Sequence, residues 1–140
     1  MTPAARRVER LQIRVAGQGL HEVTREVAEV VSRSRVDEGL CTVFVQHTSA
    51  SLVIQENADP SAARDLEAFL GRLVPEGDPL YTHTAEGPDD MPAHVKSALT
   101  ATSLSIPILG GRLGLGTWQG LFLWEHRRAR GARNLLVHVG

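Results

Sequence analysis

The stretch TVFVQHTSASLVIQENADP, residues 42–60, decides the fold of this 140-residue chain. At its start, side chains alternate between two faces with the period of two that is typical of a β-strand. One face therefore carries Cys41, Val43, Val45 and His47. An imidazole that continues an apolar row, followed at once by the hydroxyls of Thr48 and Ser49, indicates a site at a strand end. The alternative is a hairpin whose hydroxyls bond the local backbone, with His47 as a satisfied residue at its rim.

The composition is that of one soluble globular domain spanning residues 1–140, with residues 1–6 as a loose tail. Hydrophobic residues make up 42% of the chain, charged residues 22%, and the formal net charge is −1, so no global field favours nucleic acid. Cys41 is the only cysteine, which excludes an intramolecular disulfide. The start of the chain lacks a signal-peptide pattern and no run reaches transmembrane length, so we expect a cytoplasmic protein without a membrane partner.

Periodicity predicts two or three helices around that stretch. Residues 11–15 alternate as a half-buried strand, and residues 20–34 have the apolar spacing of a helix. Asp59 can cap a second helix that has Pro60 in its first position and ends at Pro75. A long connection follows over residues 75–90, and a short helix is expected over residues 91–102, with Met91, Val95 and Leu99 as its packing face.

The last third of the chain predicts β-structure. Residues 104–108 alternate, Gly110-Gly111 indicates a hairpin, and further strands are expected over residues 113–118, 121–127 and 134–139. The glycines around Thr117-Trp118-Gln119 indicate a bulge or a close backbone approach. Two or three early helices followed by late hairpins predict an α+β fold with six or seven strands.

Three histidines in loops or at element ends are candidates for binding a divalent metal or a phosphate. His47, His83 and His94 each lie near hydroxyls or carboxylates in sequence, and zinc binds three neutral imidazoles while leaving a fourth position open. The spacing matches no compact metal motif, so the alternative is three unrelated, satisfied histidines. Glu125 continues an apolar strand face and needs a partner if it is buried, and Arg127 on the same face is one candidate. Asp59, with Asn57 before it, has a second interpretation as the end of a strand and the cap of a helix.

Three segments in this order, HTSASLVIQENADP, HTAEGPDDMPAHVKSALT and GTWQGLFLWEHR, resemble the YjbQ-like family, whose members are often labelled secondary thiamine-phosphate synthase. The resemblance covers residues 11–139. It implies an α+β domain with a β-sandwich or barrel-like sheet, a homotrimer, and a polar pocket near subunit contacts. Many relatives have an asparagine-rich segment where this chain has residues 85–90, so no ligand is carried over there.

The resemblance and the residue types together assign expected roles. The catalytic candidates are His47, Glu125 and Asp59. The candidates for ligand binding are Thr48, Ser49, Asn57, Lys96, Trp118 and Gln119. The candidate ligands of a divalent metal, zinc or magnesium, are His47, His83 and His94.

Two functions follow as hypotheses. The first is an enzyme acting on a small, phosphorylated or nitrogen-heterocyclic metabolite, with thiamine-phosphate synthesis as a weak side activity, because the chain has no Gly-rich phosphate cradle. The second is a non-catalytic trimeric module that binds a metabolite. A third interpretation, in which the motifs only join subunits, predicts that substitution of His47 or Gln119 changes the sedimentation coefficient.

Overall fold

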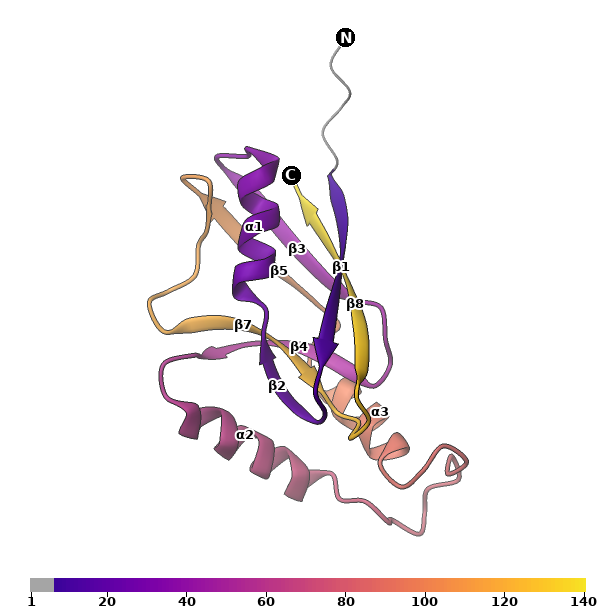
Figure 1. Cartoon of the computed structure of the whole chain (residues 1–140). Helices are drawn as coiled ribbons and strands as arrows, with labels where there is room; N and C mark the ends of the chain where they lie inside the picture. The colour runs from indigo at the N-terminus through magenta and orange to yellow at the C-terminus, as the bar shows by residue number, and fades with distance from the viewer. Residues whose placement is uncertain (1–6) are drawn as a thin grey trace.

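Two antiparallel sheets form the frame of the molecule (Figure 1). The computed structural model describes residues 7–140, so the tail expected over residues 1–6 lies outside the described residues. The larger sheet has the strand order β1-β8-β3-β5-β6 and the smaller one the order β2-β7-β4. The strands are β1 (Val8–Val15), β2 (Gly19–Glu22), β3 (Gly39–Val45), β4 (Ala50–Glu56), β5 (Ser103–Leu109), β6 (Arg112–Leu113), β7 (Gln119–Glu125) and β8 (Gly131–Val139). The helices are α1 (Thr24–Ser34), α2 (Pro60–Leu73) and α3 (Asp90–Leu99).

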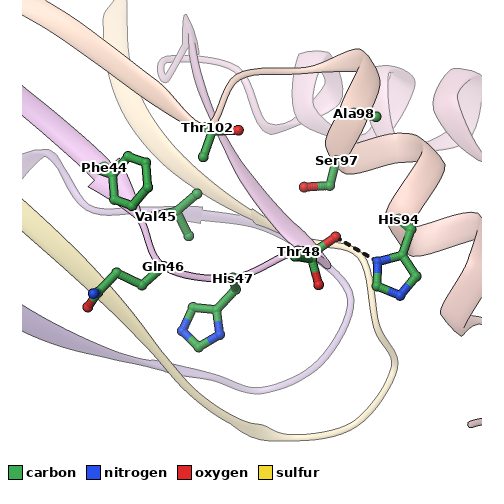
Figure 2. Close-up of a pocket in the computed structure, with 9 residues that line it drawn as sticks. All are labelled: Phe44, Val45, Gln46, His47, Thr48, His94, Ser97, Ala98 and Thr102. Atoms are coloured by element: carbon green, nitrogen blue, oxygen red, sulfur yellow. Dashed lines mark hydrogen bonds between the residues drawn. The ribbon is translucent and has the colours of Figure 1, made fainter.

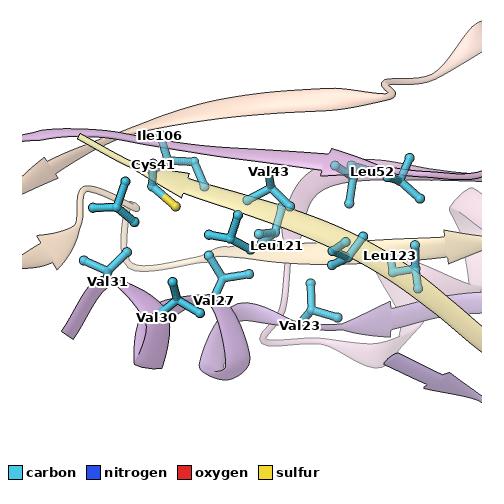
Figure 3. Close-up of a cluster of buried hydrophobic side chains, with 14 of the residues drawn as sticks. Val23, Val27, Val30, Val31, Cys41, Val43, Leu52, Ile106, Leu121 and Leu123 are labelled. Carbon is cyan, nitrogen blue, oxygen red and sulfur yellow. The ribbon is translucent and has the colours of Figure 1, made fainter. Parts of the chain in front are cut away.

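One hydrophobic core joins the two sheets and α1 (Figure 3). The valines of α1 at positions 27, 30 and 31 are buried against the inward faces of β3 and β7. Cys41 is fully buried in this core, as a packing residue in the inward row of β3. Burial of aliphatic side chains from both sheets and from the helix is the main stabilising term of the fold. The α+β prediction is confirmed.

The pairing of β4 with β7 positions most of the polar motif residues. Ala50 lies opposite Glu125, and at the other end of the ladder Glu56 lies opposite Gln119. One face of this pair, with Leu52 and Leu123, contributes to the core between the sheets. The other face carries Trp124, which packs with α2 in a second, smaller cluster. The smaller sheet is therefore buried on both sides.

The start of α2 agrees with the capping prediction, but its packing face is narrower than expected. The Asp59 carboxylate accepts a hydrogen bond from Ser61 N at 2.9 Å, with Pro60 in the first turn. Leu70 is the buried side chain of the helix, whereas Phe69 and Leu73 are more than half exposed. The helix therefore lies along the smaller sheet with only one edge of its apolar stripe covered (Figure 1).

Three expectations were wrong. Residues 20–22 belong to strand β2 rather than to the first helix, because they pair with β7. The strand expected over residues 113–118 is reduced to the two-residue β6, since the following glycines lead the chain into a loop. In α3, Val95 packs against the smaller cluster as expected, but Leu99 is exposed and the buried residues are Asp90, Pro92, Ala93 and Lys96. None of the helices in residues 7–140 is long and apolar enough to cross a membrane.

Candidate functional site

The start of α3 and the long loop before it bring two imidazoles to one carboxylate. His83 Nε2 lies 2.9 Å from Asp90 Oδ2, and His94 Nε2 lies 3.4 Å from the same oxygen. One ligand atom from each of the three residues lies within 4.8 Å of the other two. His94 and Asp90 meet because residues four apart share one face of a helix, whereas His83 enters from the loop.

Asp90 Oδ2 is a buried oxygen without a hydrogen-bond partner among the residues that the structure describes. The His83 nitrogen is close enough for an ion pair, but its N–H does not point at the oxygen with hydrogen-bond geometry. An unsatisfied buried carboxylate oxygen is costly, and a cation between the three groups would satisfy it. A tetrahedral zinc ion holds its nitrogen and oxygen ligands about 3.3 Å apart, close to the two separations from Oδ2. The donor set therefore fits a divalent metal.

Arg127 fixes the carboxylates behind this cluster. Its Nη1 donates to the other Asp90 oxygen, Oδ1, at 2.9 Å, its Nε donates to Asp89 Oδ2 at 3.1 Å, and its Nη2 donates to the Glu86 carbonyl at 2.8 Å. Burial would raise the pKa of Asp89, but hydrogen bonds from the Arg127 side chain and from Arg128 N lower it overall. Asp90 thus has one oxygen anchored and the other directed at the imidazoles.

A backbone contact also orients the ring of His94. Its Nδ1 lies 3.0 Å from the carbonyl oxygen of Thr48, the dashed contact in Figure 2. An imidazole that donates one N–H to a backbone carbonyl presents the other nitrogen, here Nε2, as a metal ligand in the correct tautomer. This contact joins α3 to the loop after β3, so the histidine motif and the HTSAS motif meet at His94.

His47 lies near this cluster without belonging to it. It lines a hollow of about 460 Å³ together with Thr48, His94 and Ser97 (Figure 2). Its Nε2 accepts a hydrogen bond from Asn134 N at 2.8 Å, which places the proton of the neutral ring on Nδ1. Burial and then the nearby charge of Arg133 lower the pKa of His47. The structure thus brings together His83 and His94 of the expected metal ligands, adds Asp90, and gives His47 a separate position.

Both carboxylate oxygens of Glu125 accept hydrogen bonds. Arg133 donates to both of its carboxylate oxygens at 2.6 Å, and Arg127 N donates to it at 3.2 Å. Arg133 also donates to the Ser49 hydroxyl at 2.9 Å. Glu125 is 1% exposed, so the ion pair of Glu125 with Arg133 is buried below the HTSAS loop. We call this ion pair the ionic brace. The partner of Glu125 is Arg133, not the Arg127 side chain that the sequence offered as a candidate.

The remaining motif residues lie at the opposite end of the β4–β7 ladder. Asn57 donates to Glu22 at 3.0 Å, and Gln119 accepts from Gly116 N at 2.8 Å. Trp118 is exposed. A Cβ on Gly120 would come within 2.7 Å of the Glu22 carboxylate and 2.9 Å of Asn57, which confirms a close approach at this turn. Within one chain these side chains line none of the hollows that contain the histidines.

Two buried groups were not predicted as site residues. The sequence offers Asp90 as one of several possible carboxylate ligands, with a helix start as its simpler interpretation, and its spacing of four from His94 is the signal of a shared face. His126 Nε2 lies 2.8 Å from the Ser51 hydroxyl, and burial lowers the pKa of His126 to about 3. The sequence shows that His126 shares a strand face with Phe122 and Trp124, which indicates burial and no more.

Comparison with known proteins assigns the family. The model of the family described as UPF0047 protein YjbQ-like matches residues 9–140. The chain belongs to the YjbQ-like family. Among curated relatives, the UPF0047 protein sll1880 of Synechocystis is 58% identical over 94% of this chain and 89% of its own length. The UPF0047 protein YjbQ of Escherichia coli O157:H7 is 43% identical over 91% of this chain and 92% of its own length.

Solved structures of the family share the fold. A yjbq/upf0047 family protein of Clostridium acetobutylicum superposes with a TM-score of 0.86 at 34% identity, covering 94% of this chain and 99% of the other. The conserved hypothetical protein TT1486 of Thermus thermophilus gives a TM-score of 0.84 at 36% identity, with the same coverage. The names that these family members carry describe no reaction.

Proposed function

We propose that this YjbQ-like protein is a divalent-metal-dependent enzyme that acts on a small molecule. The observation that carries the proposal is the buried Asp90 oxygen, which lies between two histidines without a hydrogen bond. Two imidazoles and one carboxylate favour zinc or a similar transition ion over magnesium, which prefers oxygen ligands. A divalent ion held there would polarise a phosphoryl or carbonyl oxygen of the substrate.

The residues around the centre support a substrate site in the hollow next to His94. His47 is held neutral in the tautomer that carries its proton on Nδ1, and no described residue accepts that proton. It can therefore donate a hydrogen bond to a ligand in the hollow. The Thr48 hydroxyl offers a second polar group at the same wall. Glu125 and Asp59 are each bonded elsewhere, which leaves His47 as the proposed acid–base group of the three catalytic candidates.

A weak thiamine-phosphate synthase activity is a side activity in this proposal. That reaction releases diphosphate and needs clustered cations or a metal to stabilise it. The basic side chains that could bind a diphosphate are dispersed, since Arg127 is bound to acidic groups and Arg112 lies on β6. Lys96 faces a separate cavity. A substrate with a single phosphoryl or amide group fits these surroundings better than a diphosphate.

Assembly into a homotrimer is a second proposal, supported by the outer face of the larger sheet. Leu40, Phe44 and Leu109 are exposed on this face, and no helix covers it in Figure 1. Phe44 also lines the hollow that contains His47, so a neighbouring copy would close the substrate site. Sedimentation of Phe44→Glu should show a smaller particle than the wild type, with Phe69→Glu on α2 as a control of equal chemistry.

The experiment is a turnover screen with zinc-loaded protein on p-nitrophenyl phosphate, other small phosphate esters and hydrolysable amides. We expect zinc-dependent turnover that a chelator abolishes and zinc restores. His47→Ala should retain zinc and lose turnover, whereas a non-catalytic binding module would lose only ligand affinity in that variant. Turnover that is unchanged by chelation and by Asp90→Asn would contradict the proposal.

A further inference from the structure

A separate hollow lies beside the ionic brace, at the turn that leads from β7 to β8. It measures about 260 Å³, with room for several waters and hence for a ligand of a few heavy atoms. Its lining combines the brace residues Glu125 and Arg133 with Ser49 and with residues of the turn. None of the three proposed metal ligands lines it, so the hollow is distinct from the metal centre.

The Arg133 guanidinium reaches this hollow with unused N–H donors. Its Nε and Nη2 donate to the Glu125 carboxylate, and Nη2 also donates to the Ser49 hydroxyl. A guanidinium has five N–H donors, so these three bonds leave both N–H groups of Nη1 without an acceptor among residues 7–140. Nη1 is not one of the solvent-inaccessible atoms that lack a partner, so it is open to solvent. The Arg133 side chain is only 15% exposed, and a donor in such a position without a protein partner is available to a ligand oxygen.

The Ser49 hydroxyl adds a second donor to the same wall. Ser49 is 9% exposed, and its oxygen accepts the hydrogen bond from Arg133 Nη2 at 2.9 Å. A hydroxyl also has a proton to donate, and no group in the described part of the chain accepts it. Two neighbouring donors suit an oxyanion, because its oxygens accept hydrogen bonds in several directions.

Arg130 supplies a positive charge to the hollow that no carboxylate neutralises. It lines the hollow, is exposed, and forms no ion pair within residues 7–140. Glu125 is the carboxylate in the lining, and Arg133 already neutralises it. A neighbouring hollow shares Arg130 and Gly131 and adds the side chain of Arg14. The local charge therefore favours an anion as the occupant.

We propose that this hollow binds a phosphate-type oxyanion, either free phosphate or the terminal group of a phosphorylated metabolite. Arg133 Nη1 and the Ser49 hydroxyl donate to its oxygens, and Arg130 adds a charge-assisted hydrogen bond from the rim. The ionic brace holds Arg133 in one orientation before the ligand arrives, so little side-chain freedom of Arg133 is lost on binding. This binding site is independent of the metal-dependent activity proposed above.

The test is isothermal titration calorimetry with inorganic phosphate on metal-stripped protein, because zinc would itself bind phosphate. Arg130→Gln removes the unpaired charge and should weaken phosphate binding about tenfold. Ser49→Ala removes the hydroxyl donor and should weaken binding about fivefold. Arg112→Gln is the matched control, since Arg112 is an exposed arginine that does not line the hollow. This control should bind phosphate as the wild type does.

Glycerol 3-phosphate distinguishes the two sources of the oxyanion. Binding at least as tight as that of inorganic phosphate supports a phosphorylated metabolite, and weaker binding supports free phosphate. A wild type that binds neither compound at millimolar concentration would overturn the proposal, as would equal losses of affinity in Arg130→Gln and Arg112→Gln. Neither zinc binding nor turnover enters this measurement, so a failure of the metal-dependent activity would leave its result unchanged.

Discussion

The two ends of the β4–β7 ladder carry similar polar motifs but differ in burial. At the Ala50–Glu125 end, Glu125, His126 and Asp90 are almost completely buried, and ion pairs and hydrogen bonds connect them to arginine and serine side chains. At the Glu56–Gln119 end, the polar groups bond to their neighbours at the surface. Six residue steps of about 3.3 Å separate the two ends.

The difference teaches that residue type alone does not mark a site. Both ends offer amides, carboxylates and hydroxyls. Two buried carboxylate oxygens in residues 7–140 have no hydrogen bond, Glu26 Oε2 on α1 and Asp90 Oδ2, and of these Asp90 Oδ2 at the Glu125 end lies beside two imidazoles. Burial amplifies electrostatic interactions and makes such an oxygen a strong ligand. Perturbing the two ends separately tests this comparison.

Loss of the ionic brace should have the largest effect. Glu125→Gln leaves the Arg133 guanidinium buried without its counter-ion, so we expect the free energy of unfolding to fall by about 3–5 kcal/mol. Urea unfolding at pH 7 measures this change in the free energy of unfolding. Gln119→Ala, on the same strand at the other end, should cost less than about 1 kcal/mol. Equal losses in the two variants would contradict the comparison.

Acid should destabilise the buried end through His126. Its pKa is about 3 in the folded chain because of burial, against about 6.5 in the unfolded chain. Between these values the unfolded state binds more protons, so stability is complete above about pH 6.5 and falls as the pH decreases towards 3. His126→Asn removes this contribution. Between pH 7 and pH 5, the free energy of unfolding of the wild type should fall by about 2 kcal/mol more than that of the variant. Urea unfolding at the two pH values measures this difference. Equal losses in the two proteins would be inconsistent with a buried neutral imidazole.

The helix cap at the exposed end should have a smaller effect. Asp59→Ala removes the acceptor of Ser61 N and should cost about 1 kcal/mol of unfolding free energy. Thermal unfolding measures the loss, and Asp59→Asn, which keeps a capping oxygen, should recover most of it. A large loss of zinc from either variant would show that the two ends are coupled.

The smallest effect is expected at Trp118. The side chain is 65% exposed, so Trp118→Ala should change the free energy of unfolding by less than about 0.5 kcal/mol. Sedimentation of the same variant supplies a second measurement. A smaller particle would assign Trp118 to a subunit contact and would give the exposed end a role in assembly.

Much of the fold could be predicted because local patterns and tertiary structure agree. Alternation along residues 41–45 placed the inward row of β3, and Asp59-Pro60 located the start of α2. The predictions were wrong where pairing or packing outweighed local preference. Leu20 has helical spacing with the valines of α1, but its backbone pairs with Trp124 on β7.

The candidate site was predicted only in part for the same reason. His83 and His94 could be identified as loop and helix histidines, whereas their common partner depends on how a 16-residue connection folds back onto α3, which periodicity does not encode. Asp90 had a simpler interpretation as a helix start. The Glu125–Arg133 pair joins β7 of the smaller sheet to β8 of the larger sheet, and no local pattern contains a contact between two sheets.

The most direct test of the metal centre is zinc stoichiometry, measured by elemental analysis of untagged protein that has been stripped, incubated with zinc and desalted. The comparison is between Asp90→Asn at the buried end and Asp59→Asn at the exposed end, two isosteric changes of one carboxylate. We predict about one zinc per chain in the wild type and in Asp59→Asn, and loss of that zinc in Asp90→Asn with the fold retained. A wild type that binds no zinc, or an Asp90→Asn variant that binds as much as the wild type, would contradict the account.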